Sequence, residues 1–118
     1  MTFSVVGPLR DVVYCHCTQC RKQTGNYVGA TRADDIQLTV SGSENLTWFA
    51  ASEEAERGFC KICGSALFWK RHNSDKTSIM AGVFDNPTGL KSGFHIYCAH
   101  KGDYYEISDG LPQFPGAD

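Results

Sequence analysis

The sequence lacks the features of a membrane or exported protein. It has no run of about 18 apolar residues, the minimum for a membrane-spanning helix, and its first residues, MTFSVVGPLRD, have neither the basic start nor the apolar core of a signal peptide. Positive charge is not in excess, because 11 Lys and Arg against 13 Asp and Glu give a formal net charge of −2. That balance argues against a nucleic-acid-binding surface. We expect a cytoplasmic protein with neither a membrane nor a nucleic acid as its partner.

Long helical patterns are also missing. Short β-prone segments separated by turn residues dominate, and they predict an all-β protein. We expect strands over residues 3–6, 11–14, 26–32, 35–40, 45–51, 77–84 and 93–100, and a strand, a turn and a second strand over 56–72. Gly7-Pro8 between the first two strands predicts a hairpin that leads into a cysteine cluster. With 118 residues and no visible linker or repeat, we expect a single domain over residues 1–118.

What the sequence does have is cysteine. Its six cysteines are Cys15, Cys17, Cys20, Cys60, Cys63 and Cys98. A reducing cytosol keeps thiols free and favours metal ligation over disulfides. Disulfides between near neighbours within residues 15–20 would also be strained, since a bridge needs a particular Cα separation and orientation. We therefore interpret the cysteines first as candidate metal ligands.

One short helix is expected directly after the first cysteines. Thr18 can cap its N-terminus, the helix runs to about Gln23, and Gly25 can stop it. If the backbone is extended before this helix, Cys15 and Cys17 point the same way, and Cys20 comes round on the first helical turn. All three sulfurs can then converge on one ion.

Three thiolates on a tetrahedral zinc ion leave one coordination position open, as in catalytic zinc sites. We therefore predict that Cys15, Cys17 and Cys20 hold a catalytic zinc ion, whose open position can take water or an incoming thiol. Cys60-x-x-Cys63-Gly64 is half of a zinc knuckle and needs two more ligands, for which no spare cysteine pair exists. We interpret Cys98, within GFHIYCAH, as a buried apolar residue of a strand rather than a ligand.

Three stretches together resemble a known family. VVYCHCTQCRKQTG, RGFCKICGSALFW and HIYCAHKGDYYEISDGLPQFPG are similar, in this order, to the glutathione-dependent formaldehyde-activating enzymes and centromere protein V. The resemblance implies a small β-tent of antiparallel sheets around a structural zinc, which a Cys-x-Cys and a Cys-x-x-Cys hold. It also implies a second, exchangeable zinc on Cys15, Cys17 and Cys20, and it assigns Cys60 and Cys63 to the structural site.

The sequence departs from the family pattern in one place. The family's first Cys-x-Cys precedes the strand that corresponds to FSVV, but here only Met1 and Thr2 precede Phe3. Three explanations are open: the given start lies downstream of the true one, this subgroup dispenses with the structural zinc, or Cys60 and Cys63 share ligands with the first cluster. We expect the first explanation, and we expect one bound zinc rather than two.

The resemblance implies a reaction. A glutathione-like small-molecule thiol would bind at the open zinc position and add to formaldehyde or a related electrophile, with Cys15, Cys17 and Cys20 as the catalytic residues of a carbon–sulfur lyase. Zinc is redox-inert, which suits thiol transfer. The alternative is a non-catalytic, zinc-stabilised binding module, as in the centromere-associated branch. Exposed strand edges also make a homodimer possible.

Five polar residues receive weaker interpretations. Arg21 and Lys22 follow the cluster and can pair with substrate carboxylates or form a solvated helix face. His16 points away from its two cysteine neighbours on an extended segment, so we interpret it as a residue behind the ligands or an exposed one. His95 and His100 are interpreted as structural polar groups near the sheet rim.

Large apolar residues define the expected core. Trp48, Phe49, Phe68 and Trp69 are expected to fill it, and only secondarily to line a substrate cleft. The C-terminal segment DGLPQF, residues 109–114, is expected to fold over the sheet and to bury Leu111 and Phe114 there.

Overall fold

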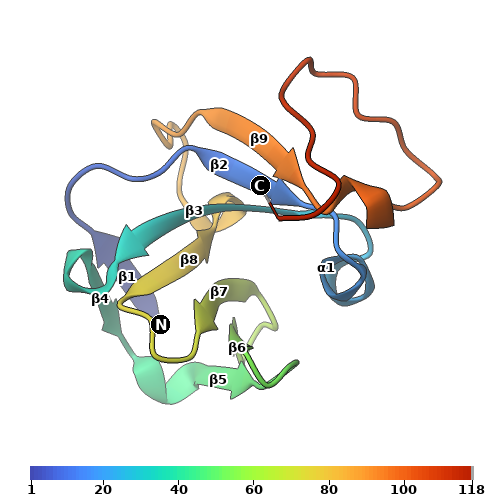
Figure 1. Cartoon of the computed structure of the whole chain (residues 1–118). Helices are drawn as coiled ribbons and strands as arrows, with labels where there is room; N and C mark the ends of the chain where they lie inside the picture. Colours follow the sequence, from blue (N-terminus) through green and yellow to red (C-terminus); the bar gives the residue numbers. More distant parts are fainter. Residues whose placement is uncertain (118) are drawn as a thin grey trace.

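The computed structural model describes residues 1–117 and is built mostly of short strands. Its elements are β1 (Thr2–Val5), β2 (Val12–Cys15), α1 (Thr18–Thr24), β3 (Val28–Asp34), η1 (Asp35–Gln37), β4 (Leu38–Ser41), η2 (Ser43–Asn45), β5 (Leu46–Phe49), β6 (Ala55–Cys60), β7 (Ala66–Arg71), β8 (Lys76–Met80), η3 (Ala81–Val83), β9 (Ser92–Ile96) and η4 (Cys98–His100) (Figure 1). The predicted β fold with one short α-helix after the cysteine cluster is therefore confirmed. Within this described part, no helix is both long enough and apolar enough to span a bilayer.

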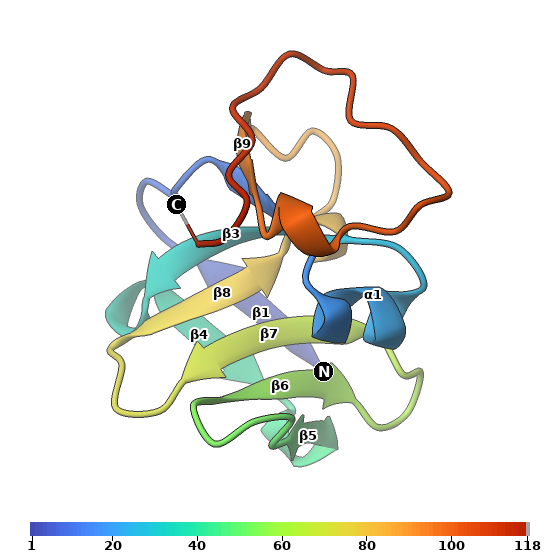
Figure 2. The same ribbon diagram turned by 45° about the vertical axis from the view of Figure 1, so that its right-hand side comes forward.

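The strands form two sheets. The larger has the order β5-β6-β7-β8-β3-β2-β9, and β1 pairs with β4 in a separate ribbon. Pairing is antiparallel except between β2 and β9, which run parallel with Cys15 opposite Ile96. β7 and β8 pair only through Phe68 with Ile79 and Trp69 with Ser78, so the large sheet bends at this junction (Figures 1 and 2). The ribbon and the bent sheet together enclose the core.

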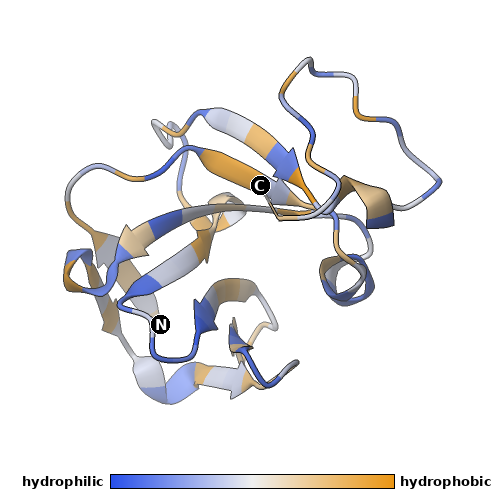
Figure 3. Cartoon of the chain, in the orientation of Figure 1, coloured by the Kyte–Doolittle hydropathy of each residue, from blue (hydrophilic) through white to orange (hydrophobic). Residues whose placement is uncertain are grey.

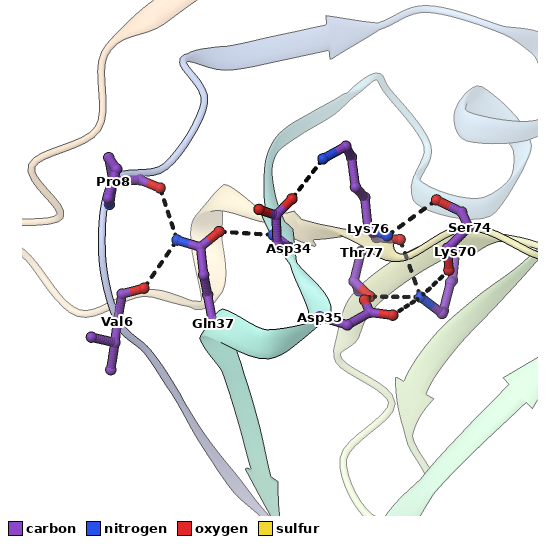
Figure 4. A network of polar contacts seen from close by, with 9 residues as sticks. All are labelled: Val6, Pro8, Asp34, Asp35, Gln37, Lys70, Ser74, Lys76 and Thr77. Carbon is purple, nitrogen blue, oxygen red and sulfur yellow. Dashed lines mark hydrogen bonds and ion pairs between the residues drawn. The ribbon is translucent and has the colours of Figure 1, made fainter.

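The predicted N-terminal hairpin is wrong. β1 pairs with β4, placing Phe3 opposite Val40, while β2 lies between β3 and β9. The reason lies in the connection, because the Gln37 side-chain amide donates to the carbonyls of both Val6 and Pro8 at 3.0 Å (Figure 4). These bonds fix the Gly7-Pro8 segment against η1, so it crosses between sheets instead of closing a two-stranded turn.

The main core lies between the β1–β4 ribbon and the large sheet. Phe68 is 2% exposed, and the Phe3 ring meets it edge-on with a centroid separation of 5.8 Å. Trp48 stacks on Phe68 from β5, and Trp69 is half-buried. Phe49 was expected in this core but is 60% exposed, because it ends the edge strand β5. Figure 3 colours the first part of β2 as hydrophobic and the end of β7 as hydrophilic.

The C-terminal segment, residues 101–117, leaves η4, makes a wide excursion and returns beside β9 (Figures 1 and 2). His95 N–H donates to the Pro112 carbonyl at 2.9 Å, and Phe114 N–H donates to the His95 carbonyl at 3.0 Å. Phe114 also packs edge-on against Phe94, as expected for a tail that buries apolar surface, and Leu111 is half-buried.

Cys98 does not lie in a strand, so that expectation is wrong. β9 ends at Ile96 because Tyr97 adopts the left-handed conformation with φ of 55°, and Cys98 opens η4 as a half-buried residue. Residues returning from the C-terminal segment cover the outer edge of β9, since Cys98 N–H donates to the Phe114 carbonyl at 3.0 Å. The homodimer stays a prediction, with β5 at the opposite edge of the sheet as its open strand.

Candidate metal centre

The three cysteines of the first motif meet where β2 passes into α1. Cys15 is the last residue of β2, and Cys20 is the buried residue of the first helical turn. The helix is capped by Cys17 rather than by Thr18, because Cys17 is still extended (φ −66°, ψ 162°) and its sulfur accepts a hydrogen bond from Cys20 N–H at 3.4 Å. Gly25 ends the helix in the left-handed conformation, as predicted.

The donor set suits a metal ion. The Sγ atoms of Cys15, Cys17 and Cys20 all lie within 4.8 Å of one another. In a tetrahedral zinc site with Zn–S distances of about 2.3 Å, neighbouring sulfurs are about 3.8 Å apart, so this cluster needs only small side-chain adjustments to hold such an ion. Cys20 is buried, whereas Cys15 and Cys17 are half-buried.

The three thiols share their protons unequally. Hydrogen bonds from Cys15 and then from Cys20 lower the pKa of Cys17 to about 2. The pKa of Cys15 is strongly raised, first by its hydrogen bond to Cys17 and next by that to Cys20. For Cys20 the bond with Cys15 lowers the pKa, but the bond with Cys17 and burial outweigh it and raise the pKa overall. Without a metal, these opposite shifts favour one thiolate, on Cys17, that two protonated thiols stabilise.

A buried cation lies directly against this cluster. Arg57, on β6, is 5% exposed and donates from Nη1 to Gln23 Oε1 at 2.7 Å and from Nη2 to Cys20 Sγ at 3.5 Å. Its charge lowers the pKa of Cys17, as a smaller contribution than the thiol hydrogen bonds. Our sequence reasoning missed Arg57. The available signal was a charged residue on the same face of a strand as Ala55, which lies two positions before it.

His16 lies between the two cysteines but belongs to another network. It is 1% exposed, so the expectation of an exposed side chain is wrong. Nδ1 lies 2.6 Å from Tyr105 Oη, and Nε2 lies 2.8 Å from Nδ1 of His95. Burial, followed by the influence of His95, lowers the pKa of His16 to about 4 and keeps it neutral. Because both ring nitrogens are already bonded, His16 stands outside the ligand set.

The hydrogen-bond network continues to Asp109, and its carboxylate determines which atom donates and which accepts in each bond. The Leu111 N–H bond lowers the pKa of Asp109, so its carboxylate is ionised and can only accept. His95 Nε2–H therefore donates to Asp109 Oδ2 at 2.8 Å, leaving Nδ1 to accept from His16 Nε2–H. His16 Nδ1 then accepts from the Tyr105 hydroxyl. The network connects His16, which lies between two candidate ligands, to the C-terminal segment. His95 forms the middle of this network, a role that the sequence analysis did not predict.

The second cysteine motif has a different arrangement. Cys60 ends β6 and is buried, while Cys63 lies on the exposed turn with its sulfur 3.1 Å from Ser65 Oγ. Hydrogen bonding with Ser65 lowers the pKa of Cys63. Across residues 1–117, the Cys, His, Asp and Glu side chains form one group of three that could hold a metal, and it excludes these two. Two sulfurs supply only half of a closed four-ligand zinc site, so the structural zinc does not fit the residues present.

The remaining polar residues that the sequence analysis named lie outside the cysteine cluster. Arg21 is half-buried and Lys22 is exposed, both near the C-terminal end of α1, so pairing with substrate carboxylates and a solvated helix face both stay open. His100 is exposed in η4.

The first 100 residues match the family model "Glutathione-dependent formaldehyde-activating enzyme". The chain belongs to this family. An uncharacterised lyase from the fission yeast Schizosaccharomyces pombe is 29% identical over 101 residues, which span 85% of this chain and 73% of the yeast protein. A crystal structure of a Rhodobacter sphaeroides protein superposes with a TM-score of 0.59 at 20% identity, over 95% of this chain and 89% of that one. This last likeness supports the fold of this family member.

Proposed function

We propose that this protein is a zinc-dependent carbon–sulfur lyase, which forms or cleaves the adduct of a small glutathione-like thiol with formaldehyde or a related electrophile. Membership of the family and the yeast relative's name as a lyase support lyase-type activity. The observation that carries the proposal is the convergence of three cysteine sulfurs within 4.8 Å, two of which belong to half-buried residues. Three protein thiolates and one open position characterise catalytic rather than closed zinc sites.

The chain's own residues would divide the work as follows. Cys15, Cys17 and Cys20 hold the metal, and Arg57 compensates their charge from the buried side. Zinc, when bound, would keep a substrate sulfur deprotonated at neutral pH and orient it. In the synthetic direction a carbon–sulfur bond forms between that sulfur and the carbonyl carbon. The carbonyl π pair moves to oxygen, which takes a proton from solvent to give the S-hydroxymethyl product, and this replaces the proton that the thiol releases to solvent when it ionises.

Cys17→Ser tests this proposal, with Cys98→Ser as the matched control outside the cluster. We expect Cys17→Ser to lose zinc and thiol-dependent formaldehyde consumption while its circular dichroism spectrum stays that of a folded β protein. Cys98→Ser should retain both properties. A zinc-loaded wild-type protein that neither binds glutathione nor consumes formaldehyde with any low-molecular-mass thiol would refute the enzyme proposal. Unfolding of Cys17→Ser together with that result would favour the zinc-stabilised binding module.

A further inference from the structure

Arg57 is a buried charge that lies directly against the cysteine cluster. Its Nη1 and Nη2 atoms donate to the neutral amide of Gln23 and to the sulfur of Cys20, and among residues 1–117 it forms no ion pair with a carboxylate. A guanidinium that is 5% exposed needs a negative partner to offset its lost hydration. The sulfur cluster is the group in contact that can carry that charge.

The single positive charge of Arg57 then matches the net negative charge of a metal-bound cluster. Three thiolates with one divalent cation leave a single negative charge, which the guanidinium balances. A neutral fourth ligand keeps this balance, and an anionic thiolate adds one further negative charge, which is less costly with a cation fixed beside the cluster. Arg57 therefore favours zinc binding by orienting a ligand sulfur, and its charge favours an anionic ligand at the open position of the loaded cluster.

We propose that Arg57 is a positioning residue that neutralises and orients the metal-holding thiolates and selects an anionic sulfur ligand over a neutral one. The inference rests on the proposed metal site. The planar guanidinium suits this role better than an ammonium group, because it directs two donors at once. One orients the sulfur of Cys20, and the other holds Gln23 three residues further along α1, so Arg57 clamps the helix that carries a ligand against β6.

Four variants separate the effect of the Arg57 charge from the effect of its two hydrogen bonds to α1. Arg57→Met removes both, Arg57→Lys keeps the charge but loses the two-point clamp, and Gln23→Leu keeps the charge and the bond to sulfur. Arg32→Met is the matched control, since it removes the same charge from an exposed position on β3. Zinc affinity is measured by competition with a chromophoric chelator, and the cobalt-substituted proteins are titrated with a thiol and with imidazole, followed by their sulfur-to-cobalt absorption bands.

We expect Arg57→Met to lower zinc affinity about ten- to hundredfold, the range for lost contacts behind metal ligands. Arg57→Lys should lie between this variant and wild type, Gln23→Leu should lose only a few-fold, and Arg32→Met should match wild type. Thiol affinity at cobalt should fall about tenfold in Arg57→Met while imidazole affinity is retained, a difference that a purely structural role would not produce.

Two results would overturn the inference. One is a folded Arg57→Met protein with zinc affinity and thiol preference within twofold of wild type. If Arg57→Met does not fold, the other is wild-type zinc affinity and absorption bands in both Arg57→Lys and Gln23→Leu. Failure of the proposed reaction would give a different result: zinc binding would still depend on Arg57, but the protein would not consume formaldehyde. A wild-type chain that binds no zinc would remove both proposals.

Discussion

The two cysteine motifs differ in what the backbone does between their sulfurs. Through Cys15, Cys17 and Cys20 the chain changes from strand to helix, and this change turns three side chains to one point, within 4.8 Å. Between Cys60 and Cys63 it makes a hairpin turn, which leaves one sulfur buried and the other exposed. Both motifs contain a Cys-x-x-Cys. A change of secondary structure, rather than spacing alone, builds the three-donor site.

The surroundings of the two motifs also differ. The first is held from behind by Arg57 and, through His16, by the buried network that reaches Asp109. The exposed member of the second motif, Cys63, contacts a serine hydroxyl on the same turn. Supporting contacts behind metal ligands fix their orientation and raise affinity. We therefore expect a tight, functionally sensitive site at residues 15–20 and a tolerant one at 60–63.

Removing one sulfur from each motif should give the largest contrast. Cys20→Ser should weaken zinc binding by more than about a hundredfold, because losing a ligand costs more than losing a contact behind one. Cys63→Ser should leave zinc affinity within about threefold of wild type, since its sulfur lies outside the three-donor group. Chelator competition checks both variants. Equal loss of zinc in the two would show instead that the motifs share an ion.

Metal uptake should also depend steeply on pH. At neutral pH the Cys17 pKa of about 2 leaves that thiol ionised, while the raised pKa values keep Cys15 and Cys20 protonated. Zinc binding then releases about two protons, so its affinity should fall about a hundredfold for each pH unit of acidification. Calorimetric titration in buffers of different ionisation enthalpy counts these protons. Release of fewer than one proton would mean that the cluster is already ionised without metal.

Breaking the buried histidine network should have a moderate effect on folding. His95→Leu leaves the Nε2–H donor of His16 without its acceptor in a place that is 1% exposed. An unsatisfied buried donor costs about 1–3 kcal/mol, so the free energy of unfolding in urea should fall by that amount. The exposed His72 supplies the control, and His72→Leu should change stability by less than about 0.5 kcal/mol. A tolerated His95→Leu would show that the network does not hold the cluster.

Local signals indicated the residues of the candidate metal centre better than their long-range contacts. Three cysteines with a following cap, helix and Gly25 are visible within a dozen residues, and local geometry nearly fixes their arrangement. One detail was wrong, because an extended Cys17 can itself accept the capping hydrogen bond and displaces Thr18 from that role.

The long-range contacts were not predictable in this way. Arg57 meets Cys20 across 37 residues, and His16 meets Tyr105 across 89, and no local pattern encodes such pairs. The false hairpin has the same origin, since Gln37 captures the Gly7-Pro8 connection from 29 residues away. Phe49 was misplaced because hydrophobicity does not tell an edge strand from a central one.

The smallest predicted effect concerns the hairpin that carries Cys60 and Cys63, which is anchored at its far end. Lys70, on β7, donates to Asp35 Oδ2 at 2.6 Å, and Thr77, on β8, donates to Oδ1 at 2.7 Å (Figure 4). Burial acts to raise the pKa of Asp35, but these hydrogen bonds outweigh it and lower the pKa below its ordinary value of 3.8.

Because the folded state lowers this pKa, the carboxylate stabilises the fold above the unfolded value, and that contribution disappears as pH falls through the folded value. Asp35→Asn should therefore lower the free energy of unfolding by no more than about 1 kcal/mol near pH 7, since the pair is partly exposed. The difference between wild type and variant should shrink below about pH 4. Urea unfolding at several pH values measures it, with the partly exposed Asp34 changed to Asn as the control. A difference that stays constant down to pH 2 would show that Asp35 acts through packing and not through its charge.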